Sequence, residues 1–514
     1  MKNIEKIVVL DNGSQYTHLI VKSVRELNIY CELRNQLPTE LDELLFIKGV
    51  ILSGGPDNIS DDYTNYLEIK DVICPILGIC YGAQYIAKYY GADIMEIDRE
   101  YGKTKIDISN EKDLLFKNID SSCPLNVWMS HSNSIIENLS SSLIMEVSSV
   151  TENGNIASFK MKDRYIYGVL FHPEVSHTSN GERIINNFLE ICKCKREWKS
   201  KNIVNKIIKN IKYKVKNDWV IMAISGGVDS TVAASLIHKA IGRRLLCLFI
   251  DNGLLRKGEF KEVLETYKQM NFNVQGIDFK KKFIQRLKNV VDPEEKRKVI
   301  GKTFIDVFCD YTKKMSTKLK YLGQGTIYSD VIESSHGSNH SRKIKSHHNV
   351  GGLPDKLSFE LIEPLRYLFK DEVRSIGKTL KIPDKIRIRH PFPGPGLGIR
   401  IIGNITEEKI NILQNADHIF ITMLKENNLY KKIWQAGVIL LNTKTVGVMG
   451  DERTYEYVVA LRAVCSREGM TANIYPFNLC FLEEVSNKII NNVTGINRVV
   501  YDVSSKPPAT IEWE

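Results

Sequence analysis

The sequence lacks the long apolar runs and the paired cysteines that would identify several common protein classes. No stretch of about 20 apolar residues occurs, so we expect no transmembrane helix and no membrane partner. The short apolar run from Ile7 to Leu10 is followed by polar residues and is too short for a signal peptide. The ten cysteines include no Cys-x-x-Cys pair, which argues against a zinc ribbon or a thioredoxin-type site. Free thiols are typical of a reducing compartment, and we therefore expect a cytoplasmic protein.

Length and charge indicate a globular protein of several domains. A chain of 514 residues is too long for one hydrophobic core, and its 43% apolar and 26% charged residues are ordinary for a soluble protein. The formal net charge is +10, and basic residues are densest from Lys193 to Lys216. Such a run could contact nucleic acid. Because Ile and Val are interleaved with the lysines, we favour a linker with a solvated helix face and expect no nucleic-acid partner.

The stretch from Trp219 to Thr231 has the pattern of a buried strand, a glycine turn and a helix start. Backbone N–H groups at such a turn, with the helix dipole behind them, form a phosphate cradle. The turn lacks the Gly-Lys-Ser/Thr ending of the common phosphate loop. Its Ser-Gly-Gly-Val-Asp-Ser sequence resembles the signature of ATP pyrophosphatases, which implies that AMP is transferred to an oxygen of the substrate. The residues predicted to bind ATP here are Ser225, Gly226, Gly227, Val228, Asp229, Ser230 and Thr231.

A second motif, Gly-Ile-Cys-Tyr-Gly, places Cys80 between two glycines after an apolar run. This is the pattern of a nucleophile elbow, which presents a side chain at a helix N-terminus, where the dipole favours the thiolate. A strand-like run, Tyr165 to Phe171, leads into His172-Pro-Glu174. In an extended backbone positions 172 and 174 point to the same side, so Glu174 can orient His172 toward Cys80. A buried inert cysteine with a structural histidine is the alternative.

These motifs resemble class I (triad) glutamine amidotransferases. The resemblance implies that Cys80 is the nucleophile, His172 the general base and acid, and Glu174 the residue that orients His172. It also implies that the turn containing Gly54 and Gly55, with the amide of Tyr81, stabilises an oxyanion. Gln84 and the segment from Trp128 to His131 match positions that bind glutamine in that family.

Further signals follow along the rest of the chain. Asp251 ends the next apolar run after the glycine turn, one strand–helix unit later. A carboxylate there could bind the ATP ribose or a metal, or cap a turn. Asp292 and Pro293 are typical of a helix start. Lys345 and the adjacent His347 and His348 lie in the segment 344–354, which follows a glycine- and serine-bearing stretch and which we interpret as a lid, with these side chains near phosphate. The Pro/Gly cluster beginning at His390 marks a boundary or a binding loop.

Five segments together resemble glutamine-hydrolysing GMP synthetases over essentially the whole chain. They are Ser-Gly-Gly-Val-Asp-Ser, Ile-Lys-Ser-His-His-Asn-Val-Gly-Gly-Leu-Pro, His-Pro-Phe-Pro-Gly-Pro-Gly-Leu, Gly-Asp-Glu-Arg-Thr-Tyr and the final Lys-Pro-Pro-Ala-Thr-Ile-Glu-Trp-Glu. The resemblance implies that glutamine supplies ammonia, that ATP with Mg²⁺ adenylates xanthosine monophosphate (XMP), and that ammonia displaces AMP to give GMP. It assigns XMP contacts to Arg453, Lys506 and Glu512, names no metal ligands, and implies a homodimer through the C-terminal domain.

The expected architecture is therefore α/β with three domains. Residues 1–198 should form the triad amidotransferase and residues 199–389 an adenine nucleotide α-hydrolase-like ATP pyrophosphatase, each with a parallel sheet. Residues 390–514 should form a smaller α+β domain for dimerisation and XMP binding.

Three other functions compete with this one. CTP synthetase carries its amidotransferase at the other end and needs a lysine-containing phosphate loop. A tRNA-adenylating enzyme would not explain the Cys80 motif. A nucleotide-binding regulator could retain the folds without catalysis, and release of pyrophosphate and AMP with XMP would exclude it.

Overall fold

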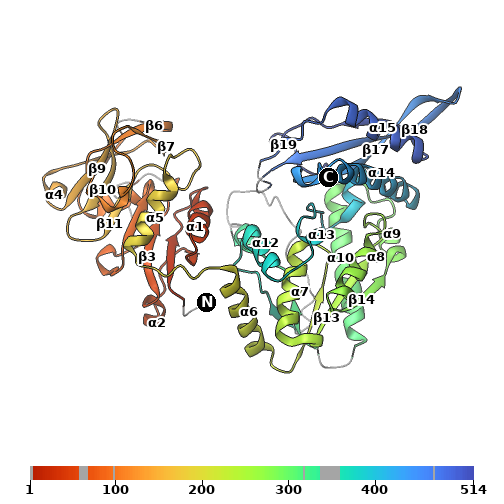
Figure 1. Cartoon of the computed structure of the whole chain (residues 1–514), viewed down its shortest axis with the longest axis horizontal. Helices are drawn as coiled ribbons and strands as arrows, with labels where there is room; N and C mark the ends of the chain where they lie inside the picture. The colour runs from red at the N-terminus through yellow and green to blue at the C-terminus, as the bar shows by residue number, and fades with distance from the viewer. Residues whose placement is uncertain are drawn as a thin grey trace. The chain divides into compact units, whose positions relative to one another are not determined.

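In a computed structural model of the chain, residues 4–56, 59, 67–96, 99–315, 319–335, 359–466, 469 and 471–514 are described. The chain divides into two compact units, Met1–Asn202 and Ile203–Glu514 (Figure 1). The first unit ends close to the boundary expected at residue 198. The second contains both of the remaining expected domains, and their boundary at residue 389 stays a prediction. None of the helices in the described ranges is both long and apolar enough to cross a lipid bilayer.

The first unit is built on one nine-stranded sheet. Its strands, in spatial order, are β2 (Cys31–Arg34), β1 (Lys6–Leu10), β3 (Ile47–Leu52), β4 (Ile76–Ile79), β11 (Ile166–Val169), β10 (Ile156–Met161), β9 (Met145–Thr151), β6 (Glu100–Ile108) and β7 (Leu125–His131). The pairs among β2, β1, β3, β4 and β11 are parallel, and those from β11 to β7 are antiparallel. A two-stranded ribbon joins β5 (Asp93–Met95) and β8 (Ser134–Ile136).

The expected strands of the first unit are all present, and they form the parallel half of the sheet. β1, β3, β4 and β11 are completely or almost completely buried, which explains why they read as unbroken apolar runs rather than alternating ones. The antiparallel half was not foreseen. β7 alternates buried and half-buried residues, because only one of its faces is fully buried. Its sequence pattern is therefore weaker evidence for a strand than an unbroken apolar run.

Helices α1 (Thr17–Glu26), α3 (Tyr81–Tyr89) and α5 (Gly181–Ile191) pack in the first unit, with α1 against α5 and α3 against β4 and β11. The short helices α2 (Leu41–Leu44) and α4 (Leu139–Ser142) complete it. The basic run that raised the question of nucleic acid is largely α6 (Ser200–Val215). Its aliphatic residues are buried or half-buried and its lysines are mostly exposed, which is the solvated helix face that the sequence predicted.

The second unit begins with a five-stranded parallel sheet. Its order is β14 (Asn273–Asp278), β13 (Leu245–Asp251), β12 (Trp219–Ala223), β15 (Leu319–Gly323) and β16 (Glu360–Ile362). Its helices are α7 (Val228–Ile241), α8 (Glu259–Gln269), α9 (Lys280–Arg286), α10 (Pro293–Lys313), α11 (Tyr328–Ser335), α12 (Lys370–Thr379) and α13 (Asp384–Arg387). The predicted start of α10 is confirmed: Asp292 caps it and accepts an N–H from Glu295 at 2.8 Å.

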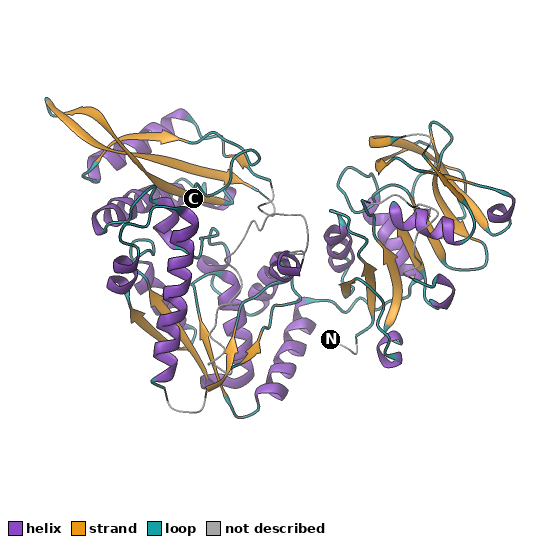
Figure 2. Cartoon of the chain, turned by 180° about the vertical axis from the view of Figure 1, so that it is seen from behind, coloured by secondary structure: helices purple, strands orange, loops and turns teal. Residues whose placement is uncertain are grey.

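The last part of the second unit is an α+β layer (Figure 2). A long hairpin of β17 (Gln435–Met449) and β18 (Glu452–Cys465) is flanked by β19 (Asn473–Ile474) and by β20 (Ile496–Tyr501), which runs parallel to β18. Helices α14 (Glu407–Glu426) and α15 (Leu479–Asn492) pack against the sheet and against each other. One buried cluster continues from Leu254, Phe283 and Ile300 into α14 and the hairpin. This layer therefore shares its hydrophobic core with the parallel-sheet part.

Candidate active sites

Cys80 occupies the tight turn that joins β4 directly to α3. It is buried, and its φ of +51° is a conformation that side chains other than glycine seldom adopt. A β-carbon on Gly82 would lie 2.4 Å from the main-chain oxygen of Leu52, and one on Gly78 2.5 Å from that of Gly82. Both glycines are therefore needed for α3 to pack this closely. The turn holds the thiol at the helix N-terminus, where negative charge is favoured.

His172 follows β11 and is fixed at its main chain and at its ring. Its backbone N–H donates to the carbonyl of Trp128 at 2.9 Å, and its Nδ1 lies 2.7 Å from Oε1 of Glu174. Burial by itself lowers the pKa of His172, but the Glu174 carboxylate and the interaction with Cys80 raise it to about 10. The imidazole is thus held as a cation next to the thiol, an arrangement that suits a nucleophile, an acid–base group and its orienting carboxylate.

The glycine turn after β3 packs against the same histidine. A β-carbon on Gly54 would lie 3.2 Å from Cε1 of His172, and one on Gly55 would lie 3.3 Å from Cγ of Tyr81. The structure therefore brings both predicted oxyanion glycines next to the elbow. Asn12 fixes this turn, since its N–H donates to Oγ of Ser53 and its side-chain amide donates to the Ser53 carbonyl, both at 2.9 Å.

Strand β7 and the residues after it close the site. Nε2 of Gln84 donates to the carbonyl of Asn133 at 3.0 Å, and Sγ of Cys80 lies 3.6 Å from the carbonyl of Ser130. Gln84 thus connects α3 to Asn133, two residues after the Trp128–His131 segment. Two contacts of His172 were missed from the sequence: Oγ1 of Thr178 donates to its carbonyl at 2.6 Å, and the ring of Tyr16 packs edge-on at 5.1 Å. Tyr16 lies 156 residues before His172, and Thr178 lies only six residues after it but belongs to no motif that we recognised in the sequence.

A second buried histidine, His131, lies close to His172 but is uncharged near neutral pH. Nε2 of His131 lies 3.4 Å from Oε2 of Glu100, and both side chains are buried. Burial, helped by the positive charge of His172, lowers the pKa of His131 to about 4. Near neutral pH, only one of these two histidines is therefore positively charged, and that is the one beside Cys80.

Replacing Glu174 by glutamine should shift the pH dependence of glutamine hydrolysis. The carboxylate stabilises the cationic form of His172, so its loss lowers the pKa of His172 from about 10. Removing a charge at this range typically shifts a pKa by about 1–3 units. The alkaline limb of the kcat profile for glutamate formation should therefore move toward lower pH, because the imidazolium that protonates the leaving nitrogen is lost earlier. An unmoved alkaline limb would contradict this role.

In the second unit, the glycine turn lies between β12 and α7 as the sequence predicted. Gly226 has φ +74°, which favours glycine, and the turn is closed by side-chain hydroxyls. Oγ of Ser225 and Oγ of Ser230 lie 3.1 Å apart, and Oγ1 of Thr231 donates to the carbonyl of Gly227 at 2.7 Å. Because α7 begins at Val228, the free N–H groups of its first turn are available to a phosphate.

Two basic residues that the sequence analysis missed surround this turn. Lys370, the first residue of α12, forms an ion pair with Asp229. Arg389 donates to the carbonyl of Gly226 at 3.2 Å and pairs with Glu259. The only signal for Arg389 was its place immediately before the Pro/Gly cluster at His390. Both cations would favour the binding of a polyphosphate at the turn.

Asp251 ends β13 at the same edge of the sheet, but its carboxylate is already engaged. Its Oδ1 accepts the N–H of Gly253 at 2.9 Å, and its Oδ2 lies 3.1 Å from Nζ of Lys280. These contacts are those of the turn-capping alternative. A role toward the ATP ribose or a metal stays a prediction.

The three residues predicted to bind XMP lie in different places. Nζ of Lys506 donates to the carbonyl of Gly469 at 2.7 Å, near the end of β18. Glu512 receives a two-point contact from Arg400, at 2.7 and 2.9 Å, and a hydrogen bond from Gln435 at 2.6 Å. Arg453 lies opposite Val448 at the far end of the hairpin and is exposed, roughly 40 Å of strand from Cys465. Within one chain, the structure does not bring Arg453 together with the other two.

The predicted lid residues Lys345, His347 and His348 lie outside the described residues. The described residues of the two units form two sites with different chemistry. The first unit holds a buried thiol beside a histidine–glutamate pair, and the second holds a helix N-terminal turn bordered by lysine and arginine, where a polyphosphate could bind.

Comparison with known proteins gives a consistent result along the chain. Three family models match successive parts: class-I glutamine amidotransferase at residues 8–192, NAD synthase at residues 200–311, and the GMP synthase C-terminal domain at residues 422–513. The glutamine-hydrolyzing GMP synthase of Cytophaga hutchinsonii is 52% identical over 518 residues, covering 99% of this chain and 100% of the relative. Those of Thermosipho melanesiensis and Porphyromonas gingivalis are 50% and 49% identical, each with 99% of this chain and 100% of the relative covered.

Proposed function

The chain belongs to the family of glutamine-hydrolysing GMP synthases, and we propose how its residues divide that reaction between two sites. As a member of this family it is a carbon–nitrogen ligase that takes the amide nitrogen of glutamine. It adenylates XMP with ATP, releasing pyrophosphate, and aminates the adduct to GMP, releasing AMP. The amidotransferase half performs the hydrolysis, and the ATP pyrophosphatase half performs the adenylation.

At the first site, we assign nucleophilic attack on the glutamine amide to the Cys80 thiolate. The His172 imidazolium, held by Glu174, then protonates the departing nitrogen, so ammonia leaves and a glutamyl thioester remains. The neutral imidazole next activates a water molecule that hydrolyses the thioester to glutamate. Gly54, Gly55 and the amide of Tyr81 would stabilise the tetrahedral oxyanion in both steps.

At the second site, we assign the pyrophosphate portion of ATP to the turn from Ser225 to Thr231. The XMP oxygen attacks the α-phosphorus, and pyrophosphate departs toward the first turn of α7, where N–H groups and the helix dipole stabilise its charge. Lys370 and Arg389 add positive charge on either side. Ammonia then displaces AMP, which is a far better leaving group than the unmodified oxygen.

The residues at this turn also fit a magnesium ion. Oδ1 of Asp229 is buried and has no hydrogen-bond partner among the described residues, and a carboxylate oxygen is a ligand that Mg²⁺ prefers. We propose that Asp229 would hold a Mg²⁺ ion brought in with ATP, which would neutralise phosphate charge.

We further propose that two copies of the chain associate through the end of the β17–β18 hairpin. Val446 and Tyr455 face each other across the hairpin and Val448 lies on the same face; all three are exposed, Val448 at 76%. An apolar face of this kind marks an interaction surface. Because Arg453 and Lys506 lie at opposite ends of the hairpin, a second copy of the chain would be needed to bring them into one XMP site. Sedimentation should give twice the 58.7 kDa chain mass, and a single-chain mass at micromolar concentration would contradict the proposal.

The proposal that the reaction is divided between two sites rests on one observation: the same chain holds both the Cys80–His172–Glu174 set and the phosphate turn. The test is to measure GMP, pyrophosphate and glutamate in parallel, with XMP and ATP and with either glutamine or an ammonium salt. We expect GMP from both nitrogen sources, and chelation of Mg²⁺ should stop pyrophosphate release. Adenylation of tRNA in place of XMP would overturn the assignment.

A further inference from the structure

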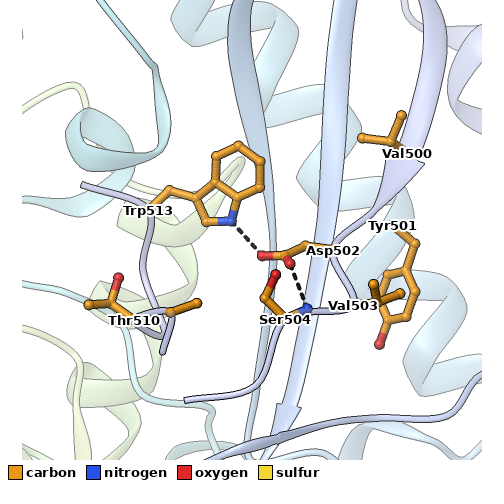
Figure 3. Close-up of a pocket in the computed structure, with 8 residues that line it drawn as sticks. Val500, Tyr501, Asp502, Val503, Ser504, Thr510 and Trp513 are labelled. Carbon is orange, nitrogen blue, oxygen red and sulfur yellow. Dashed lines mark hydrogen bonds between the residues drawn. The ribbon is translucent and has the colours of Figure 1, made fainter. Parts of the chain in front are cut away.

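One face of α8 supports the phosphate turn. Glu259, Val263 and Tyr267 are spaced four residues apart along this helix, so they share one face. Each reaches a different point of the turn, either directly or through one intermediate side chain. A surface pocket of about 500 Å³ lies near the end of the chain, around Asp502 and Trp513 (Figure 3), and the residues that line it include none of the turn. The contacts from α8, rather than this pocket, therefore limit how the turn can move.

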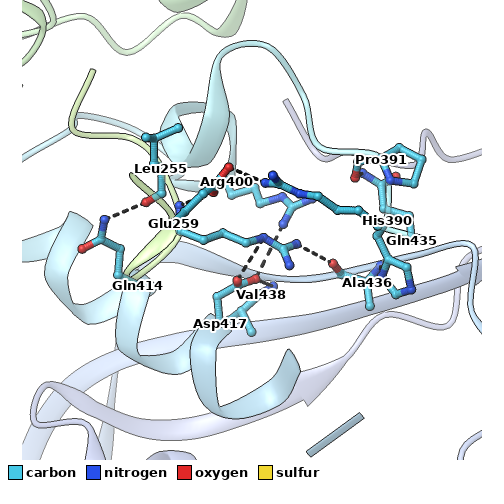
Figure 4. Close-up of polar contacts among 12 residues, drawn as sticks. Leu255, Glu259, His390, Pro391, Arg400, Gln414, Asp417, Gln435, Ala436 and Val438 are labelled. Atoms are coloured by element: carbon cyan, nitrogen blue, oxygen red, sulfur yellow. Dashed lines mark hydrogen bonds and ion pairs between the residues drawn. The ribbon is translucent and has the colours of Figure 1, made fainter. Parts of the chain in front are cut away.

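The first contact passes from Glu259 through Arg389 to the main chain of the turn. The Glu259 side chain is 6% exposed, and its Oε1 accepts a hydrogen bond from Nη2 of Arg389. Its Oε2 accepts the N–H of Arg256 at 2.9 Å, so both carboxylate oxygens are engaged (Figure 4 shows Glu259 in its network of polar contacts). The second terminal nitrogen of Arg389, Nη1, donates to the carbonyl of Gly226 at 3.2 Å. The guanidinium of Arg389 thus connects the buried carboxylate to the turn.

Val263 and Tyr267 make the other two contacts. A β-carbon on Gly226 would lie 3.0 Å from Cγ2 of Val263, so Val263 closes the space on that side of the turn. The hydroxyls of Tyr267 and Thr231 lie 2.7 Å apart. Because Thr231 donates its only hydroxyl proton to the carbonyl of Gly227, Tyr267 is the donor in this pair. Burial raises the pKa of Tyr267 to about 12, so this donor keeps its proton near neutral pH.

Two of these contacts hold carbonyl groups of the turn, and each fixes the opposite side of the same peptide. A peptide group is planar and trans, so its carbonyl and its N–H point in opposite directions. By holding the Gly226 carbonyl, Arg389 directs the N–H of Gly227 to the opposite side. Thr231 holds the Gly227 carbonyl and orients the N–H of Val228 by the same geometry. These N–H groups lie at the start of α7, where an anion is favoured.

We propose that Glu259 is a positioning residue for the ATP site, which acts through Arg389 to hold the main chain of the turn in its phosphate-binding conformation. The proposal rests on the function above, in which this turn holds the pyrophosphate portion of ATP. Arg389 then contributes more by its planar fork than by its charge, because the carboxylate of Glu259 balances that charge. An unsupported turn would have to be ordered at each binding event, and that entropy cost would weaken the binding of pyrophosphate.

The test measures how strongly inorganic pyrophosphate inhibits ammonia-dependent GMP formation, because this anion probes the turn directly. Glu259→Gln should raise the inhibition constant for pyrophosphate and KM for ATP about tenfold, as is typical when a hydrogen bond to a charged group is lost. KM for XMP should stay unchanged. Arg389→Lys keeps a positive charge but loses the fork, and it should raise the same two constants to a similar extent. The double variant should show no larger effect than either single variant, since both changes break the same set of contacts.

Glu265→Gln is the matched control, because Glu265 is an exposed carboxylate on the same helix and its replacement should change none of these constants. A purely structural role would lower the melting temperature of Glu259→Gln without changing pyrophosphate inhibition. That result would overturn the proposal. So would an Arg389→Lys variant that is inhibited by pyrophosphate as strongly as the unaltered chain, which keeps the test decisive if Glu259→Gln does not fold. Absence of pyrophosphate inhibition in the unaltered chain would instead overturn the proposed ATP site.

Discussion

Replacing Cys80 by alanine should abolish GMP formation from glutamine and leave GMP formation from ammonia unchanged. No thioester can form without the thiol, and loss of a catalytic nucleophile typically lowers kcat by about 10⁴-fold or more. The phosphate turn lies in a separate compact unit with its own core, so adenylation does not depend on this side chain. Initial rates with each nitrogen source, on the same preparation, measure the effect.

Cys123→Ala is the matched control for this variant. Cys123 is an exposed thiol in the same unit, and its loss should leave both rates unchanged. Cys80→Ser adds a conservative test, since it keeps the size and the strained φ of the turn but lacks a thiolate. If ammonia-dependent synthesis disappeared with glutamine-dependent synthesis while Cys80→Ala stayed folded, the assignment of the two reactions to two sites would be wrong.

The reciprocal result is expected for Gly226→Ala, which should stop pyrophosphate release but preserve glutamine hydrolysis. Alanine is strained at φ +74°, and its β-carbon would lie 2.9 Å from Nη1 of Arg389 and 3.0 Å from Cγ2 of Val263. The turn must shift to relieve these contacts, and the N–H groups aimed at the phosphates shift with it. A displacement of about 1 Å at an active site typically costs about 10²-fold in rate.

Gly242→Ala separates this effect from general loss of stability. Gly242 also has a positive φ, at the other end of α7, but its added β-carbon would meet no atom within 4 Å. Both variants should lower the melting temperature, whereas only Gly226→Ala should lose pyrophosphate release with XMP and ATP. Normal pyrophosphate release by Gly226→Ala would remove the turn from the ATP site.

Both motif turns could be predicted from the sequence because their conformations are local. The strand runs before Cys80 and before Ser225 are short and apolar, and glycines mark the positions where no β-carbon fits. The pairing of His172 with Glu174 was also predicted from their close spacing, with only Pro173 between them, although the structure places Pro173 and Glu174 in a turn rather than in extended backbone. The contact confirmed at 2.7 Å required no knowledge of the rest of the fold.

The surroundings of these motifs could not be predicted in the same way. Lys370 lies 141 residues from Asp229, and the Ser130 carbonyl lies 50 residues from Cys80. Each such contact depends on how strands pair, and β7 belongs to the antiparallel half of the sheet that the sequence analysis missed. A lysine that binds a carboxylate has the same local pattern as one that faces solvent.

The sequence by itself determined which reactions this protein carries, because the thiol, the acid–base pair and the phosphate turn are each contained within a few consecutive residues. Only the tertiary structure decided which side chains hold the final segment. The contact of Glu512 with XMP stays a prediction, and the structure shows that its carboxylate is bound by Arg400, 112 residues away, and that Glu514 is paired with Lys296, 218 residues away. The physical reason is that buried charges must find counter-charges, and the folded arrangement of the whole unit decides which ones come within reach.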